Sequence, residues 1–178
     1  MSRVATERER TFDAGEIIVS KTDLRGRIVY ANDVFLRVAG YDEGEVLGTP
    51  HSFVRHPDMP RGVFRLLWDT IRAGEEIFAY VKNFTKSGDF YWVFAHVTPT
   101  FDDAGTITGY HSSRRVPRRE ALVEVQRIYA EMRAAESAVS DAKSKADASV
   151  QLLGEMLAKR GLTYAELMFE LELAPEAA

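Results

Sequence analysis

One short stretch, HSFVRHPDMPRGVF at residues 51–64, places polar and ring-bearing side chains directly before an apolar helical pattern. Arg55 and His56 can hold an anion, and a guanidinium presents a planar fork of N–H donors to it. The helix expected from Pro60 adds backbone N–H groups and the positive end of its dipole. Asp58 can orient either basic side chain. Taken alone, the loop favours a rigid turn in which Asp58 caps the helix and the prolines stiffen the chain.

A second candidate for ligand chemistry is Asn83, at the end of a predicted strand. Its amide can donate and accept hydrogen bonds at the edge of a planar ring. The alternative is that it ends the strand before a turn. Phe64 and Trp68 lie four residues apart on the predicted helix, so they are core residues first and can also line a cavity.

Four histidines make haem an alternative ligand, because one axial imidazole is sufficient. His51 and His56 are the best placed for this role, since His96 and His111 fall on predicted strands. The ligand cluster that a zinc site requires is missing from the sequence.

Catalytic chemistry finds little support. The chain has no cysteine, which excludes disulfides, thiolate metal sites, thiol catalysis and a flavin–thiol photoadduct. It also shows no Ser-His-Asp order with a nucleophile elbow, no P-loop and no glycine-rich dinucleotide fingerprint. We therefore expect a protein that is not an enzyme.

Length and composition predict one domain with an appendage. The chain has 178 residues, 46% of them hydrophobic and 28% charged, as in soluble globular proteins. A net charge of −4 offers no reason to expect nucleic acid or an anionic membrane as partner. The amino-terminal MSRVATERERTF is no signal peptide, and no apolar run approaches the length of a membrane span. The expected location is the cytoplasm.

Alternating and periodic apolar residues predict the elements that must position these side chains. One long helix is expected from Pro60 to the residue before Gly74, and Asn32 is the expected N-cap of a short helix. The predicted strands cover residues 16–22, 27–31, 76–84, 90–99 and 106–114. This order predicts an α+β fold, a five-stranded antiparallel sheet with helices on one face, over about 100 residues.

The chain changes character after Pro117. Apolar residues from Leu122 to Leu157 follow one heptad register, with Glu136 and Lys143 in the missing positions. Such a helix can lie on its own domain or form a coiled coil between two chains, and the second interpretation is favoured for residues 118–138. Arg114, Arg115, Arg118 and Arg119 form a basic cluster that we expect to be a solvated helix start rather than a nucleic-acid surface.

The predicted organisation has four parts. They are an amino-terminal cap segment at 1–15, a sensory domain at 16–116, an amphipathic or coiled-coil helix at 117–145, and a carboxy-terminal helical hairpin at 146–178. Within the last part, Thr163 and Glu166 form a predicted capping box.

The motifs NDVFLRVAGYDEGEVLG and GDFYWVFAHVTPTFDDAGTITGY resemble a PAS sensory domain. More narrowly, VRHPDMP, VKN and GDFYWV are similar to the PAS domain of bacterial aerotaxis receptors, the energy-taxis sensors that carry FAD. The resemblance covers residues 12–117. It implies FAD in a cleft between helices and sheet, and a redox signal passed to a chemoreceptor module.

The resemblance also implies roles for particular residues. It points to Asn32, Arg55, His56, Asp58, Phe64 and Asn83 as positions needed for FAD binding or signalling, and Trp68 and Tyr91 match family aromatics near the pocket. His51 is a further candidate for cofactor binding. Arg55 and His56 would then serve the pyrophosphate, and Asn83 the isoalloxazine edge. The chain departs from the family pattern at Ile77, Ala79 and Phe84, which take positions of tryptophan, glycine and arginine.

These observations leave three functions open. The first is an FAD-bound redox or oxygen sensor, dimeric through the helix after Pro117, with a separate chemoreceptor or kinase as signalling partner. The second is a ligand-free PAS dimerisation or docking module, in which Ile77, Phe78 and Phe84 fill the cavity. The third is a haem-binding gas sensor.

Overall fold

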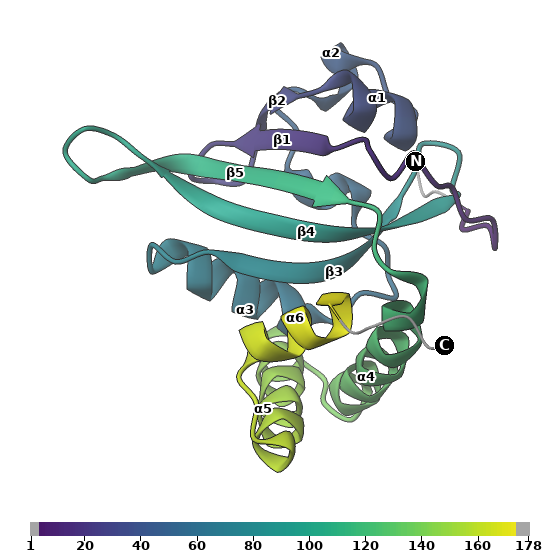
Figure 1. Cartoon of the computed structure of the whole chain (residues 1–178), viewed down its shortest axis with the longest axis vertical. Coiled ribbons are helices and arrows are strands. Elements are labelled where there is room, and N and C mark those ends of the chain that lie inside the picture. Colours follow the sequence, from purple (N-terminus) through teal and green to yellow (C-terminus); the bar gives the residue numbers. More distant parts are fainter. Residues whose placement is uncertain (1–3, 174–178) are drawn as a thin grey trace. The chain divides into compact units, whose positions relative to one another are not determined.

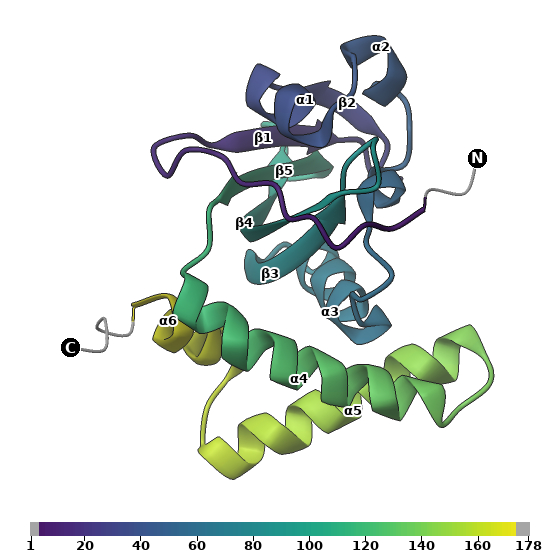
Figure 2. The same cartoon turned by 90° about the vertical axis from the view of Figure 1, so that its right-hand side faces the viewer.

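The computed structural model describes residues 4–173, which form two compact units (Figures 1 and 2). The first unit contains the residues up to His56 together with Thr70–Val116. The second contains Pro57–Asp69 together with the residues from Pro117 onward. Each unit is therefore made of two separate stretches of the chain.

The first unit is built on the predicted five-stranded antiparallel sheet. Its strands are β1 (Ile18–Thr22), β2 (Ile28–Ala31), β3 (Ile77–Phe84), β4 (Phe90–Phe101) and β5 (Ile107–Arg115). The strand order is β2-β1-β5-β4-β3, and every neighbouring pair is antiparallel. This sheet confirms the strand prediction. The strands could be predicted because tight turns and alternating apolar residues are signals within a few neighbouring residues.

Three short helices connect β2 to the rest of this unit. They are α1 (Asp33–Ala39), α2 (Glu43–Val46) and the 3₁₀ helix η1 (His51–Val54), of which α1 and α2 contact β1 and β2. Asn32 is the N-cap of α1, as predicted, and Gly40 ends it with a left-handed φ of 75° that favours glycine. The sequence did not predict η1.

The amino-terminal segment runs beside the turn between β3 and β4. Glu9 forms a parallel bridge with Phe90, and the guanidinium of Arg10 pairs with Asp89 at 2.9 Å. The hydroxyl of Thr6 donates to the same carboxylate at 2.8 Å. The described part of the predicted cap segment is thus held on this turn.

The second unit is helical. It contains the first nine residues of α3 (Arg61–Arg72) with α4 (Arg119–Ser137), α5 (Ala142–Arg160) and α6 (Tyr164–Leu173). The helix expected to continue to residue 145 ends instead at Ser137, and Asp141 caps α5 through the N–H groups of Lys143 and Ser144. The capping box of Thr163 and Glu166 is confirmed by both of its hydrogen bonds.

The heptad seam of α4 is buried within a single chain. Leu122, Val125, Tyr129 and Met132 are each at most 5% exposed, and α4 packs against α5 (Figure 2). The intramolecular hairpin therefore uses the residues that suggested a coiled coil between two chains. Within residues 4–173, no helix combines the length and apolar character needed to cross a bilayer.

Candidate ligand site

The sheet divides the candidate residues between its two faces. Side chains alternate along a strand, and directly paired residues share a face. Asn83 pairs with Tyr91, so these two side chains lie on one face. The registers of β4 with β5 and of β1 with β5 place Arg114, Ser112 and Ser20 on the same face.

His56 lies on the opposite face. Its ring contacts Phe84 with centroids 4.2 Å apart and planes tilted by 46°, and it meets Phe90 edge-on at 6.0 Å. Its backbone N–H donates to the carbonyl of Lys82, whereas Arg55 forms a bridge with Asn83. The structure therefore separates His56 from the face of Asn83, and Phe84 is an aromatic contact of this histidine.

The amide of Asn32 is engaged by the backbone. Its oxygen accepts from the N–H groups of Val19 and Phe35, both at 3.0 Å, and its nitrogen donates to the carbonyl of Ile17 at 2.8 Å. These bonds join the start of α1 to β1. The role of Asn32 in ligand binding stays a prediction.

A buried polar cluster occupies the same face of the sheet as Asn83. Arg114 is 4% exposed, and its Nη2 donates to Ser20 Oγ at 2.5 Å and to His51 Nε2 at 2.7 Å. The Nη1 atom of Arg114 and the Oγ of Ser112 are buried without a hydrogen-bond partner in the structure. Among the described side chains, no carboxylate hydrogen-bonds this guanidinium.

The expectation that Arg114 belongs to a solvated basic cluster was therefore wrong. On β5, Tyr110, Ser112 and Arg114 are buried, whereas the residues between them are partly exposed. This alternation with a period of two is the signal that sequence reasoning missed. The neighbouring Arg115 is exposed, as expected.

Burial also determines the charge states of the cluster. It lowers the pKa of Arg114 to about 10, so the guanidinium remains charged at neutral pH. Burial, and then the charge of Arg114, lower the pKa of His51 to about 3. His51 is consequently neutral, and its Nε2 accepts the hydrogen bond from Arg114. A buried cation with an open donor is suited to an anionic or electron-rich ligand atom.

The histidines considered for haem have other neighbours. The Nε2 of His51 faces Arg114, and the Nε2 of His96 lies 2.6 Å from a carboxylate oxygen of Glu76. The ring of His56 is packed against aromatic side chains. No group of three histidine or acidic side chains suited to a metal ion occurs within residues 4–173.

The remaining candidates belong to the second unit. Phe64 and Trp68 lie on α3 and are partly exposed. A carboxylate oxygen of Asp58 accepts from the guanidinium of Arg133, on α4, at 3.1 Å. The motif residue expected to orient Arg55 or His56 thus contacts a carboxy-terminal helix.

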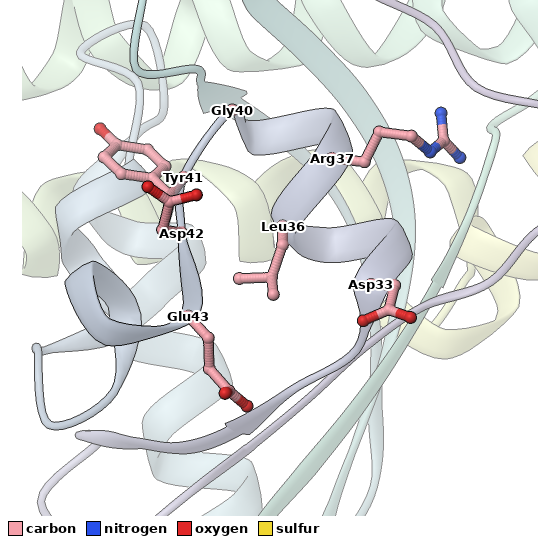
Figure 3. A pocket seen from close by; sticks show the side chains of 7 residues that line it. All are labelled: Asp33, Leu36, Arg37, Gly40, Tyr41, Asp42 and Glu43. Atoms are coloured by element: carbon pink, nitrogen blue, oxygen red, sulfur yellow. The ribbon is translucent and has the colours of Figure 1, made fainter.

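A separate hollow of about 440 Å³ opens on the surface beside α1 and α2 (Figure 3). It contains none of the residues that the sequence singled out. Three of its lining residues are acidic, and the whole lining consists of Asp33, Leu36, Arg37, Gly40, Tyr41, Asp42 and Glu43. We therefore place the candidate ligand site at the buried cluster and not at this hollow.

Comparison with known proteins supports the fold. Residues 28–114 match the family model described as the PAS fold. The aerotaxis receptor of Escherichia coli K12 is 43% identical over 112 residues, which cover 63% of this chain and 22% of the receptor. Phototropin-1A of Oryza sativa subsp. japonica is 32% identical over 80 residues, covering 45% of this chain and 9% of that protein.

Solved structures support the same fold. A light-oxygen-voltage domain studied with a flavin analogue aligns with a TM-score of 0.55 and 24% identity, over 65% of this chain and 87% of that one. The light-state LOV domain of the photoreceptor Aureochrome1 aligns with a TM-score of 0.54 and 22% identity, over 66% and 91%. The chain spans less than a quarter of the two curated relatives described above. It therefore carries a PAS fold, and its sequence resembles that of the aerotaxis receptor.

Proposed function

We propose that this protein is a signal-transduction sensor whose PAS domain binds FAD and reports redox or oxygen state to a separate signalling protein. The partner would be a chemoreceptor or a kinase, and the setting the cytoplasm. The resemblance to aerotaxis receptors supports this proposal, since the named relative with 43% identity is one. In the proposed role, the protein carries a signal and catalyses no reaction.

The observation that carries the proposal is the buried charge of Arg114. A charged group inside a protein is costly unless it is paired. The Nη2 atom of Arg114 donates to two neutral partners, whereas its Nη1 has no acceptor in the structure. The buried hydroxyl of Ser112, on the same face of the sheet, also has no partner in the structure. A ligand with an electron-rich edge on this face would supply the missing acceptors.

The residues on this face fit the polar edge of a flavin. Asn83 and Ser112 can donate and accept hydrogen bonds, and Arg114 can donate only. A bound flavin supplies reversible electron transfer, and reduction makes its polar edge more negative. Arg114 would stabilise that charge, because it cannot itself give up a proton at neutral pH. His51 would orient the guanidinium by accepting from Nη2.

The first experiment is an absorption spectrum of the purified full chain, followed by heat release and identification of any ligand. A two-band flavin spectrum that bleaches with dithionite, with FAD released, is the expected result. A Soret band would replace the proposal by haem. A colourless protein that does not take up FAD would favour the ligand-free docking module.

Three variants connect the spectrum to the site. We expect Arg114→Met and Asn83→Ala to lower the FAD content about tenfold or more. Each change removes a hydrogen-bond donor from the face of the sheet that carries the candidate ligand site. Arg115→Met is the matched control, since this neighbouring arginine is exposed and should leave the FAD content unchanged. Equal FAD content in wild type, Arg114→Met and Asn83→Ala would contradict the assignment of the site.

Dimerisation through the helix after Pro117 stays a prediction. The seam that suggested it is packed within one chain, so a dimer would use other surfaces of α4 or an opened hairpin. Sedimentation of the full chain at several concentrations decides between monomer and dimer.

A further inference from the structure

Helix α3 is shared between the two units along its length. Residues 61–69 cluster with α4, α5 and α6, and residues 70–72 with the sheet. The first turn of any helix has backbone N–H groups without intrahelical acceptors. The partners that satisfy them in α3 therefore show what the start of this helix is attached to.

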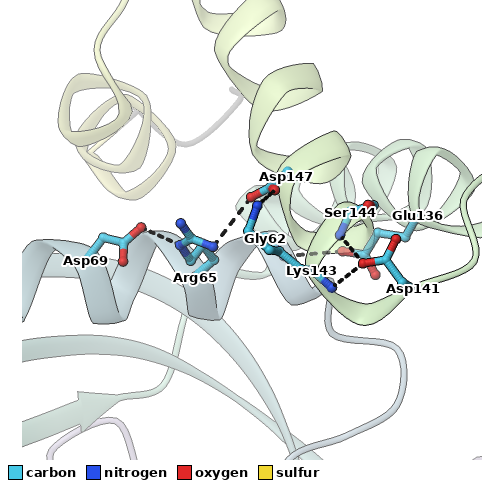
Figure 4. A network of polar contacts seen from close by, with 8 residues as sticks. All are labelled: Gly62, Arg65, Asp69, Glu136, Asp141, Lys143, Ser144 and Asp147. Atoms are coloured by element: carbon cyan, nitrogen blue, oxygen red, sulfur yellow. Dashed lines mark hydrogen bonds and ion pairs between the residues drawn. The ribbon is translucent and has the colours of Figure 1, made fainter.

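A buried carboxylate from α4 satisfies these groups. Glu136 Oε1 accepts from the N–H of Arg61 at 2.6 Å. The same oxygen accepts from the N–H of Gly62 at 3.2 Å (Figure 4). Glu136 is 8% exposed, and its negative charge lies at the positive end of the helix dipole. We call this arrangement the Glu136 cap. It also explains why the heptad seam has a glutamate at this position.

Helix α5 meets the same turn of α3. A Cβ atom added at Gly62 would lie 2.5 Å from Ser149 Oγ and 2.7 Å from Ser149 Cβ, distances that real side chains do not allow. Ser149 is fully buried, and its hydroxyl has no partner in the structure. Glycine at position 62 is therefore what allows α5 to approach α3.

Exposed ion pairs surround this contact. Arg65 pairs with Asp147 on α5 at 3.4 Å and with Asp69 at 2.6 Å, and both interactions are open to solvent (Figure 4). Exposed pairs of this kind contribute little to stability and are screened by salt. The Glu136 cap and the Gly62–Ser149 approach are thus the stronger attachments.

The hairpin itself does not depend on these attachments. Helices α4 and α5 pack on each other extensively, whereas α3 contacts them at few positions. Arg160 of α5 also pairs with Glu124 of α4. If the hairpin left α3, water could bind the two N–H groups and the carboxylate, and the α4–α5 packing would persist.

We propose that the α4–α5 hairpin is a releasable regulatory element, held on the first turn of α3 by the Glu136 cap and the Gly62–Ser149 contact. Its release would expose the start of α3, directly after the VRHPDMP motif, and change the surface offered to the signalling partner. The regulatory part rests on the proposed sensor function; the release itself is a property of the contacts described.

Cysteine cross-linking tests the release, because the chain contains no cysteine of its own. The Arg65→Cys/Asp147→Cys pair reports contact between α3 and α5, and the Glu124→Cys/Arg160→Cys pair reports the hairpin. The rate of reaction with a short bismaleimide is measured on the full chain. Gly62→Ala should slow the first pair at least about fivefold and leave the second unchanged.

Two further variants sharpen this test. Adding Ser149→Gly to Gly62→Ala should recover part of the lost rate, because it removes the side chain that the new methyl group meets. Gly154→Ala is the matched control on α5, since no atom lies within 4 Å of the added methyl group. Unchanged rates in Gly62→Ala, or equal loss for both pairs, would overturn release of an intact hairpin.

The regulatory role has a test of its own. If the protein contains FAD, anaerobic photoreduction should change the cross-linking rate of the Arg65→Cys/Asp147→Cys pair and not that of the other pair. An unchanged rate in FAD-loaded protein would overturn the regulatory role and leave the sensor proposal intact. Absence of FAD would instead reject the FAD proposal, and the Gly62→Ala result would still decide whether the hairpin is released.

Discussion

Arg114 in the sheet unit and Glu136 in the helical unit are both buried charges, and no oppositely charged side chain within residues 4–173 is bonded to either of them. Arg114 is 4% exposed and Glu136 8%. Glu136 receives two backbone N–H groups at a helix start, where a negative charge is favoured. Arg114 has only neutral acceptors and keeps one nitrogen without any.

This difference separates a structural charge from a functional candidate. The partners of Glu136 are supplied by the fold, so its charge stabilises the attachment of α4 to α3. Within the described residues, one nitrogen of Arg114 has no hydrogen-bond acceptor. We therefore attribute the burial of this charge to the ligand proposed above. Perturbed ionisable groups of this kind are enriched at functional sites.

The largest predicted effect tests this contrast through stability. Glu136→Leu should lower the free energy of unfolding by about 2–4 kcal/mol, because two helix N–H groups would be buried without an acceptor. Arg114→Met should leave the stability of the ligand-free protein unchanged or raise it, since Ser20 and His51 can still bond each other at 3.1 Å. Urea denaturation of both variants, freed of ligand, measures this. Equal destabilisation by the two changes would remove the distinction.

The free energy of unfolding should depend on pH through His51, the hydrogen-bond acceptor of Arg114. The folded pKa of His51 is about 3, below its unfolded value of about 6.5, so the unfolded chain binds more protons between these values. Its contribution to stability is complete above pH 6.5 and is lost as the pH falls toward 3. From pH 6.5 to 5 the free energy of unfolding should fall by at most about 1.4 kcal/mol per pH unit.

The His51→Gln variant should reduce this slope. His111→Gln is the necessary comparison, because burial also lowers the pKa of His111, to a smaller extent. The carboxyl groups with lowered pKa values, such as Glu124 at about 2, titrate below this range in the folded protein and near pH 4.5 in the unfolded one. An unaltered slope in His51→Gln would show that the imidazole does not face Arg114.

The smallest effect is expected for the exposed ion pairs that surround the Glu136 cap. Asp147→Asn removes exposed pairs with Arg65 and Lys143, so stability should fall by less than about 1 kcal/mol. The difference from wild type should shrink further in 1 M salt, where the Debye length is about 3 Å. A loss as large as that of Glu136→Leu would mean that the ion pairs, and not the cap, hold the hairpin.

Sequence reasoning predicted the sheet well and the candidate site in part. The five strands, the Asn32 cap and the Thr163 box were recognised, because each depends on residues close together in the chain. His51 was singled out, but as a possible ligand residue and not as the neutral acceptor of Arg114. His56 and Asn83 were grouped together, although strand alternation places them on opposite faces.

The sequence by itself determined the fold class, the strands and the helix ends that have a local cap, such as Asn32 and Thr163. Turn glycines, apolar periods and caps act over a few residues, so they can be read without a structure. The tertiary structure alone decided which charges are buried and what they meet. Arg114 reaches Ser20 across 94 positions, and Glu136 reaches Arg61 across 75. No local pattern specifies such pairings, because they arise only when distant segments pack together.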